Sequence, residues 1–274
     1  MSGLMTIAKL ELVAAVRLKW VRLLTAAFAL LAAAAAYSAG AAGELVGADT
    51  FPRTTMALMP AALILIPLAA MILGVSGQSA EAGSEPFLFG QPVSRSSVLI
   101  GRWLGELAAL AGTIVLGFAS GAVVIAMNAG AGGATRFAAF VASAVLLAAI
   151  FLSIAATIAA ATEKRIVALG IATFVWFFFV LLYDGVALSV AGWLTGMAGG
   201  RILFGSVFTN PADLVRVVML FASGTASVLG AAGEAWLRFL GGEGRAIVAA
   251  TVAIAAWIAI PLGVATLALA RRDL

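Results

Sequence analysis

The stretch FAAFVASAVLLAAIFLSIAATIAAA, residues 137–161, runs for 25 residues without a charged side chain. A helix of about 20 apolar residues is long enough to cross the hydrocarbon core of a bilayer. The rest of the 274-residue chain has the same character, since hydrophobic residues make up 64% of it and charged residues only 10%. A soluble domain carries roughly 25% charged residues at its surface. The composition therefore predicts an all-α integral membrane protein.

Six segments have the length and the hydrophobicity of transmembrane helices. They lie at residues 23–42, 56–76, 98–127, 137–161, 166–190 and 247–270. We expect one transmembrane domain over residues 1–274, with an N-terminal interfacial helix at 1–22, a cytoplasmic loop at 77–97 and an external segment at 191–246. With the N-terminus inside, ten of the 16 basic residues are cytoplasmic. The positive-inside rule then favours a topology with both termini in the cytoplasm.

Two segments allow a different topology. Residues 17–42 have the basic and apolar regions of a secretory signal peptide, although a 22-residue basic region that contains Glu11 is long for one. Residues 217–233 are apolar enough for a seventh span, but an odd number of spans would place Arg271 and Arg272 outside. We expect an interfacial or re-entrant helix there instead.

The chain lacks the residues and motifs of common membrane enzymes and metal proteins. It has no Cys and no His, which excludes thiolate and imidazole metal ligands and nucleophiles. It also has no GxxxxGK[ST], GxSxG or HExxH motif. The ionisable residues Glu106 and Asp184 lie near the ends of spans, so an ion-coupled carrier has little to use. We expect no enzyme activity, no bound metal and no nucleic-acid partner; a secondary carrier and a membrane scaffold stay open.

The stretch GSEPFLFGQPVSRSSVLIGRWLGEL, residues 83–107, is polar and contains two prolines. Ser84 can cap a short helix that has Phe87 and Phe89 on its surface, and Pro92 would end that helix. Ser94 can cap the next helix. The stretch is either a docking surface for a cytoplasmic partner or a solvated loop with ordinary positive-inside arginines. The residues of the predicted docking surface are Glu81, Gly83, Ser84, Glu85, Phe87, Leu88, Phe89, Pro92, Ser94, Arg95 and Arg102.

A second signal lies in TNPADLVR, residues 209–216, within the external segment. Asn210 is a favourable N-cap, and Pro211 suits the first helical position. Asp213 is placed to interact with the helix dipole, and Arg216 lies three residues further on, where it can pair with Asp213. These four residues predict either a capped interfacial helix that serves the fold or a contact for an external partner.

Taken together, these features resemble the permeases of ABC-2 type transporters. The resemblance lies in the six spans, the basic N-terminal helix and the loop pattern Glu81, Gly83-Ser84, Pro92–Arg95 and Gly101-Arg102. Residues 209–220 are similar to an NPxDxxR motif of the NosY family, the permeases of nitrous-oxide-reductase maturation transporters. Family members often have Thr-Leu after the loop glycine, where this chain has Ser84, Glu85 and Pro86.

The resemblance implies an ABC-2 permease fold of the type V exporter kind and a permease homodimer. The loop at 77–97 would carry a coupling helix that docks on a separate, NosF-like ABC ATPase subunit, which binds ATP and Mg²⁺. A periplasmic β-helical protein, NosD-like, would lie above the external segment. ATP hydrolysis would then drive transport, or conformational work, for assembly of the copper–sulfur centre of nitrous oxide reductase. An ABC-2 exporter of a lipid, a drug or another small hydrophobic molecule is the alternative.

Overall fold

The computed structural model describes residues 2–41, 50–78, 94–129, 132–193, 197–225 and 229–270, and within these ranges it contains helices and no strand. Six helical stretches in this part of the chain are long and apolar enough to cross a membrane. They confirm the six predicted spans, each with boundaries shifted by a few residues. The spans are α2 (Lys19–Ala41), α3 (Thr50–Gln78), α5 (Arg95–Ala129), α6 (Ala134–Ala161), the stretch Arg165–Trp193, and α12 (Glu243–Ala270).

The fifth span consists of three consecutive pieces. They are α7 (Arg165–Phe177), a π-helical turn η1 (Phe178–Leu182) and α8 (Tyr183–Trp193). In the π turn, the backbone N–H of Tyr183 donates to the carbonyl of Phe178, five residues earlier. Such turns are rare and often occur at functional sites. The hydrophobic pattern predicted a span here but contained no signal for the wider turn.

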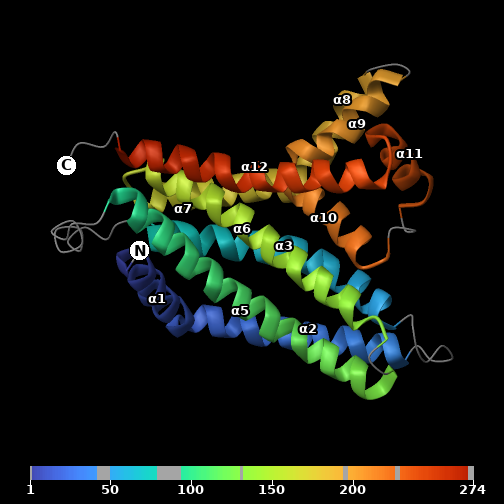
Figure 1. Ribbon diagram of the computed structural model, residues 1–274, viewed down its shortest axis with the longest axis horizontal. Coiled ribbons are helices and arrows are strands. Elements are labelled where there is room, and N and C mark those ends of the chain that lie inside the picture. The colour runs from blue at the N-terminus through green and yellow to red at the C-terminus, as the bar shows by residue number, and fades with distance from the viewer. Residues whose placement is uncertain are drawn as a thin grey trace.

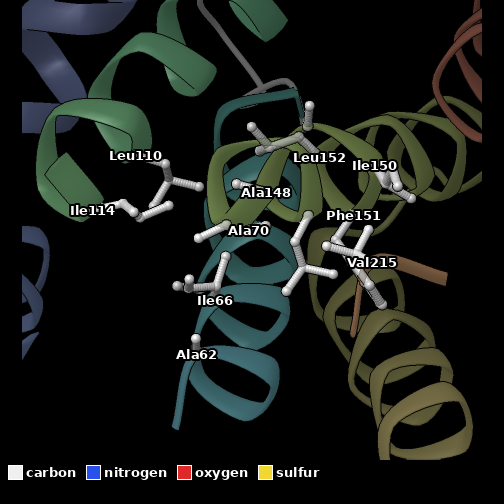
Figure 2. Packing of buried hydrophobic residues seen from close by; sticks show 14 of the residues in the cluster. Ala62, Ile66, Ala70, Leu110, Ile114, Ala148, Ile150, Phe151, Leu152 and Val215 are labelled. Atoms are coloured by element: carbon white, nitrogen blue, oxygen red, sulfur yellow. The ribbon is translucent and has the colours of Figure 1, made fainter. Parts of the chain in front are cut away.

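Helix α6, the stretch quoted at the outset, forms the centre of the bundle. It contacts α3 and α5, and it also contacts α10 (Pro211–Ala222) and α12. Figure 2 shows Ala148 and Leu152 of α6 packed near Ala70 of α3. The helices approach closely at Gly74, where an added β-carbon would lie 2.7 Å from the β-carbon of Ala155. Small residues at such contacts are typical of helix packing in membranes.

The N-terminal helix α1 (Ser2–Arg17) is shorter than the predicted 1–22, because the chain leaves helical geometry at Leu18 before α2 begins. Helix α1 lies against α5 at the end of the bundle where α12 also ends (Figure 1). We call this the α1 end. Helix α11 (Gly230–Leu240) lies at the opposite end.

The predicted external segment contains three helices: α9 (Met197–Thr209), α10 and α11. The axes of α9 and α10 meet at 92°, so this pair is either a broken span or a re-entrant loop. The expectation of one helix over 217–233 is wrong. Helix α10 ends at Ala222, and Gly224 has a φ of 72°, so the chain turns there before α11. Left-handed glycine is a common helix stop, which gives the turn its physical reason.

Candidate functional site

Most of the predicted docking surface lies outside the described residues. This applies to Glu81, Gly83, Ser84, Glu85, Phe87, Leu88, Phe89 and Pro92, and also to the side chain of Arg95. The structure does describe the two flanks, where α3 ends at Gln78 and α5 follows Ser94. The Ser94 hydroxyl accepts a hydrogen bond from the backbone N–H of Ser97 at 3.2 Å, which confirms the predicted cap. Both flanks lie at the α1 end (Figure 1).

Two glycines of α5 let α1 approach its backbone. A β-carbon at Gly101 would lie 3.0 Å from the carbonyl oxygen of Leu4, and one at Gly105 would lie 2.5 Å from that of Ala8. Real β-carbons essentially never come closer than 3.0 Å to such an atom, so a larger residue at Gly105 must displace α1, and one at Gly101 requires α1 to shift slightly. The N-terminal helix is therefore packed directly on the start of the third span.

Arg102 and Glu106 lie one turn apart on α5 but differ in exposure. Arg102 is half-buried, and it acts electrostatically on Glu11 of α1 and on Glu106. Glu106 is completely buried where α1 and α3 meet α5, so it does not share an exposed face with Arg102. The sequence placed Glu106 near the end of a span but contained no sign that α1 lies beside it.

The Asn210 side chain closes the junction between α9 and α10. Its Oδ1 atom accepts a hydrogen bond from the N–H of Ala212 at 3.0 Å, which confirms the predicted N-cap, and Pro211 occupies the first turn. Its Nδ2 atom donates to Asp213 Oδ2 at 2.9 Å and to the carbonyl of Phe179 at 3.1 Å. This last bond joins the start of α10 to the π turn of the fifth span.

Arg216 forms the predicted ion pair with Asp213, at 2.6 Å between NH2 and Oδ1. Arg216 also reaches Asp184 of α8, at 3.5 Å between NH1 and Oδ2. Asp184 was recognised in the sequence only as an acid near the end of a span. Its partner is 32 residues away along the chain, so no local spacing could have linked the two.

The burial of these groups limits what they can contact. Asn210 is 1% exposed and Asp213 is 8% exposed, and Pro211 is buried as well. These three residues, predicted as external partner contacts, face the interior of the protomer. The side chain of Arg216 is 44% exposed. Of the four, Arg216 alone presents much of its surface outward.

The C-terminal end of α9 is held by two further hydrogen bonds. The Tyr183 hydroxyl of α8 lies within hydrogen-bond distance of the Thr209 hydroxyl, and Trp257 Nε1 of α12 donates to the carbonyl of Phe208 at 3.0 Å. The sharp bend is therefore tied to the fifth and sixth spans. Across the described ranges, no group of three or more acidic residues is arranged to hold a metal ion. The arrangement can transmit movement between the helices but contains no catalytic constellation.

The comparisons with known proteins agree with this architecture. The family model described as ABC-2 family transporter protein matches residues 5–274. A protein of Pseudomonas aeruginosa named "Probable ABC transporter permease protein NosY" is 33% identical over 227 residues, covering 78% of this chain and 80% of the relative. A protein of the same name from Stutzerimonas stutzeri is 29% identical over 238 residues, covering 84% and 86%. The chain therefore belongs to the ABC-2 family of transporter proteins, as a multi-pass permease subunit of an ABC transporter.

Proposed function

We propose that this permease is the membrane subunit of a NosY-type ABC transporter. A separate ATPase subunit hydrolyses ATP, and the permease couples that hydrolysis to transport or conformational work that serves assembly of the copper–sulfur centre of nitrous oxide reductase. The observation that carries the proposal is the likeness to two NosY permeases over about four fifths of the chain. The NPxDxxR motif adds support, because its residues form the contacts that fasten α10 to the fifth span.

The proposal places the α1 end in the cytoplasm, with both termini, and α11 in the periplasm. The flanks of the loop at 77–97 then face a cytoplasmic ATPase. The tight packing of α1 on Gly101 and Gly105 supports a coupling role, because a push on the start of α5 also moves α1. Rigid contacts of this kind transmit displacement better than a flexible joint.

The homodimer belongs to the same proposal. The fifth span has many large apolar side chains on its outer surface, among them Ile166 at 82% exposed, Phe174 at 65% and Leu188 at 64%. In a membrane, such a surface contacts either lipid or a second copy of the chain. A periplasmic β-helical partner would complete the assembly above α9–α11.

The experiment is a double substitution in the predicted coupling helix. Phe87→Asp together with Phe89→Asp should abolish co-purification of the ATPase subunit, because two charges would replace the apolar surface that docks. Membrane insertion of the permease should be unchanged. The matched control, Phe87→Leu with Phe89→Leu, keeps an apolar surface and should retain most of the binding. Normal co-purification of the ATPase with the aspartate variant would refute the coupling assignment.

A readout of the biological role follows from the same pair of variants. In cells that depend on this transporter, the aspartate variant should yield nitrous oxide reductase without its copper–sulfur centre, as measured by the visible absorption of the purified reductase. The leucine control should give the loaded enzyme. If the reductase is loaded equally in both strains while the ATPase is lost, the chain has another task, and export of a small hydrophobic molecule becomes the better assignment.

A further inference from the structure

Two carboxyl groups meet at the α1 end, where α1, α3 and α5 converge. Glu11 lies on α1 and Glu106 on α5, and both side chains lie beside Gly77, next to the last residue of α3. A β-carbon on Gly77 would lie 2.8 Å from Glu11 Oε1 and still closer to Glu106 Oε1. Both oxygens lie close to the same position beside Gly77. At such a separation, ionisation of one carboxyl group strongly disfavours ionisation of the other.

The burial of Glu106 is compensated only in part, by the charge of Arg102 and by the nearby side chain of Gln78. The exposed fraction of Glu106 is 0%, and neither of its carboxyl oxygens has a hydrogen-bond partner among the described residues. An ionised carboxylate in such a place is costly, and a carboxyl group there takes up a proton instead. Glu106 therefore points into the junction as a buried group that requires a ligand.

Glu11 shares this environment from the other side. Burial raises the pKa of Glu11 above its ordinary value, and the nearby guanidinium of Arg102 opposes that rise. Glu11 belongs to α1, outside the six spans, and its side chain is only partly buried. The two acids therefore differ in their access to solvent.

Among the described residues, Arg102 is the cation that acts on both carboxyl groups. It lies one turn before Glu106 on α5. The polar neighbour on α3 is Gln78, which is uncharged and whose Nε2 atom donates to the carbonyl of Leu99 at 3.3 Å. One arginine can balance one carboxylate. A proton on the pair balances the other.

We propose that Glu11 and Glu106 form a proton-binding site in which one shared proton holds α1 against α3 and α5. With one proton bound, one carboxyl group of the pair is neutral and the guanidinium of Arg102 balances the other. The proton comes from water, and no bond other than O–H forms or breaks. This site goes beyond the proposed function, and its test needs neither the ATPase nor nitrous oxide reductase.

The direction of the pH effect follows from the raised affinity for protons. While the site is protonated, the repulsion between two carboxylates is absent and α1 stays attached, and this contribution is fully present at low pH. As the pH rises through the titration of the folded protein, the proton leaves and two carboxylates face a single Arg102. Their repulsion then loosens α1 from the start of the third span.

The experiment follows α1 with a spin label in the full-length chain in lipid nanodiscs. The natural sequence has no cysteine, so Leu10→Cys, at an exposed position of α1, gives a single label. Label mobility, and the distance to a second label at Leu116→Cys on the exposed side of α5, should increase between about pH 5 and pH 9. A flat response of the otherwise unchanged chain over this range would overturn the proposal.

Two pairs of variants identify the groups. Glu106→Gln keeps a neutral hydrogen-bonding side chain, so α1 should stay attached at every pH and the response should vanish. Glu234→Gln, at an exposed acid of α11, should retain the full response.

Gly77→Ala places a methyl group between the two carboxyl groups and should free α1 even at low pH. Gly112→Ala, where the added methyl meets open space, should leave α1 attached.

An infrared measurement gives a readout independent of helix movement. The chain should show the C=O band of a protonated carboxyl that shifts in heavy water, and this band should disappear in Glu106→Gln. A pH response that survives in Glu106→Gln, or a carboxyl band that persists there unchanged, would assign the proton to another site and reject the pair.

Discussion

Asn210 connects three parts of the molecule through one side chain. It caps α10, it orients Asp213, and it binds the carbonyl of Phe179 in the π turn. We expect Asn210→Ala to lower the free energy of unfolding by about 1–3 kcal/mol, since it removes a cap and leaves buried polar groups without partners. Thermal unfolding in detergent measures the change.

The control for this substitution is Thr173→Ala. The Thr173 hydroxyl bonds only to the carbonyl of Leu169 on an exposed face of α7, so its loss should change stability by less than about 0.5 kcal/mol. Equal losses in the two variants would mean that the Asn210 contacts add nothing beyond an ordinary helix hydrogen bond.

For individual residues, the sequence predicted contacts between residues that are close along the chain, but it did not predict contacts between residues that are far apart along the chain. The Asn210 cap, the Ser94 cap and the Asp213–Arg216 pair are all set by spacings of two or three residues, and all three form as predicted. The contact between Arg216 and Asp184 depends on how two spans pack, so spacing contained no sign of it.

Helix α10 is the element whose role most needs a direct test. The residues of its first turn are buried, and Arg216, in the second turn, has a side chain that is 44% exposed. Arg216→Gln removes the charge while an amide can still bond to Asp213. If α10 holds a periplasmic partner, this variant should reduce co-purification of that partner and leave the ATPase and the protein yield unchanged.

Arg238→Gln provides the comparison, because Arg238 is an exposed arginine of α11 that also pairs with an acid, Glu234. It should bind the partner normally. If the partner is retained in full by both variants, or if Arg216→Gln makes the whole complex dissociate, then α10 serves the fold and does not dock.

For the helices, the hydrophobic pattern predicted the spans but not the breaks and turns between them. Apolar length located all six spans, since burial in lipid requires about 20 such residues in a row. The pattern did not locate the break at Leu18 or the turn at Gly224, and the helix start predicted at Asn210 and Pro211 did not give the 92° angle between α9 and α10. Backbone geometry decides these places, and composition does not record it.

The orientation of the whole molecule can be tested with single cysteines in the cysteine-free chain. Lys9→Cys lies on an exposed position of α1, and Glu234→Cys lies on α11 at the opposite end of the bundle (Figure 1). We expect a membrane-impermeant maleimide to label Glu234→Cys in intact spheroplasts. It should label Lys9→Cys only after the membrane is opened, because the basic residues favour a cytoplasmic α1 end.

Lys19→Cys, at the start of α2 near α1, should behave as Lys9→Cys does and serves as the internal check. Labelling of Lys9→Cys and Glu234→Cys from the same side would require an even number of crossings between them, whereas the six-span topology has five. The bent pair α9–α10 would then have to be counted as a seventh span.

The π turn at Phe178–Leu182 has one more consequence, which concerns chain length. Each residue of an α-helix advances the side-chain direction by about 100°, and a π turn takes up one residue more than an α-helical turn over a similar rotation. If these five residues returned to α geometry with none removed, all of α8 would rotate by about 100° relative to α7. Asp184 would then turn away from Arg216 although both residues of the ion pair are still present. Deletion of one residue within the π turn, with a return to α geometry, keeps the direction of α8, so such a deletion should be better tolerated here than in α7 or α8.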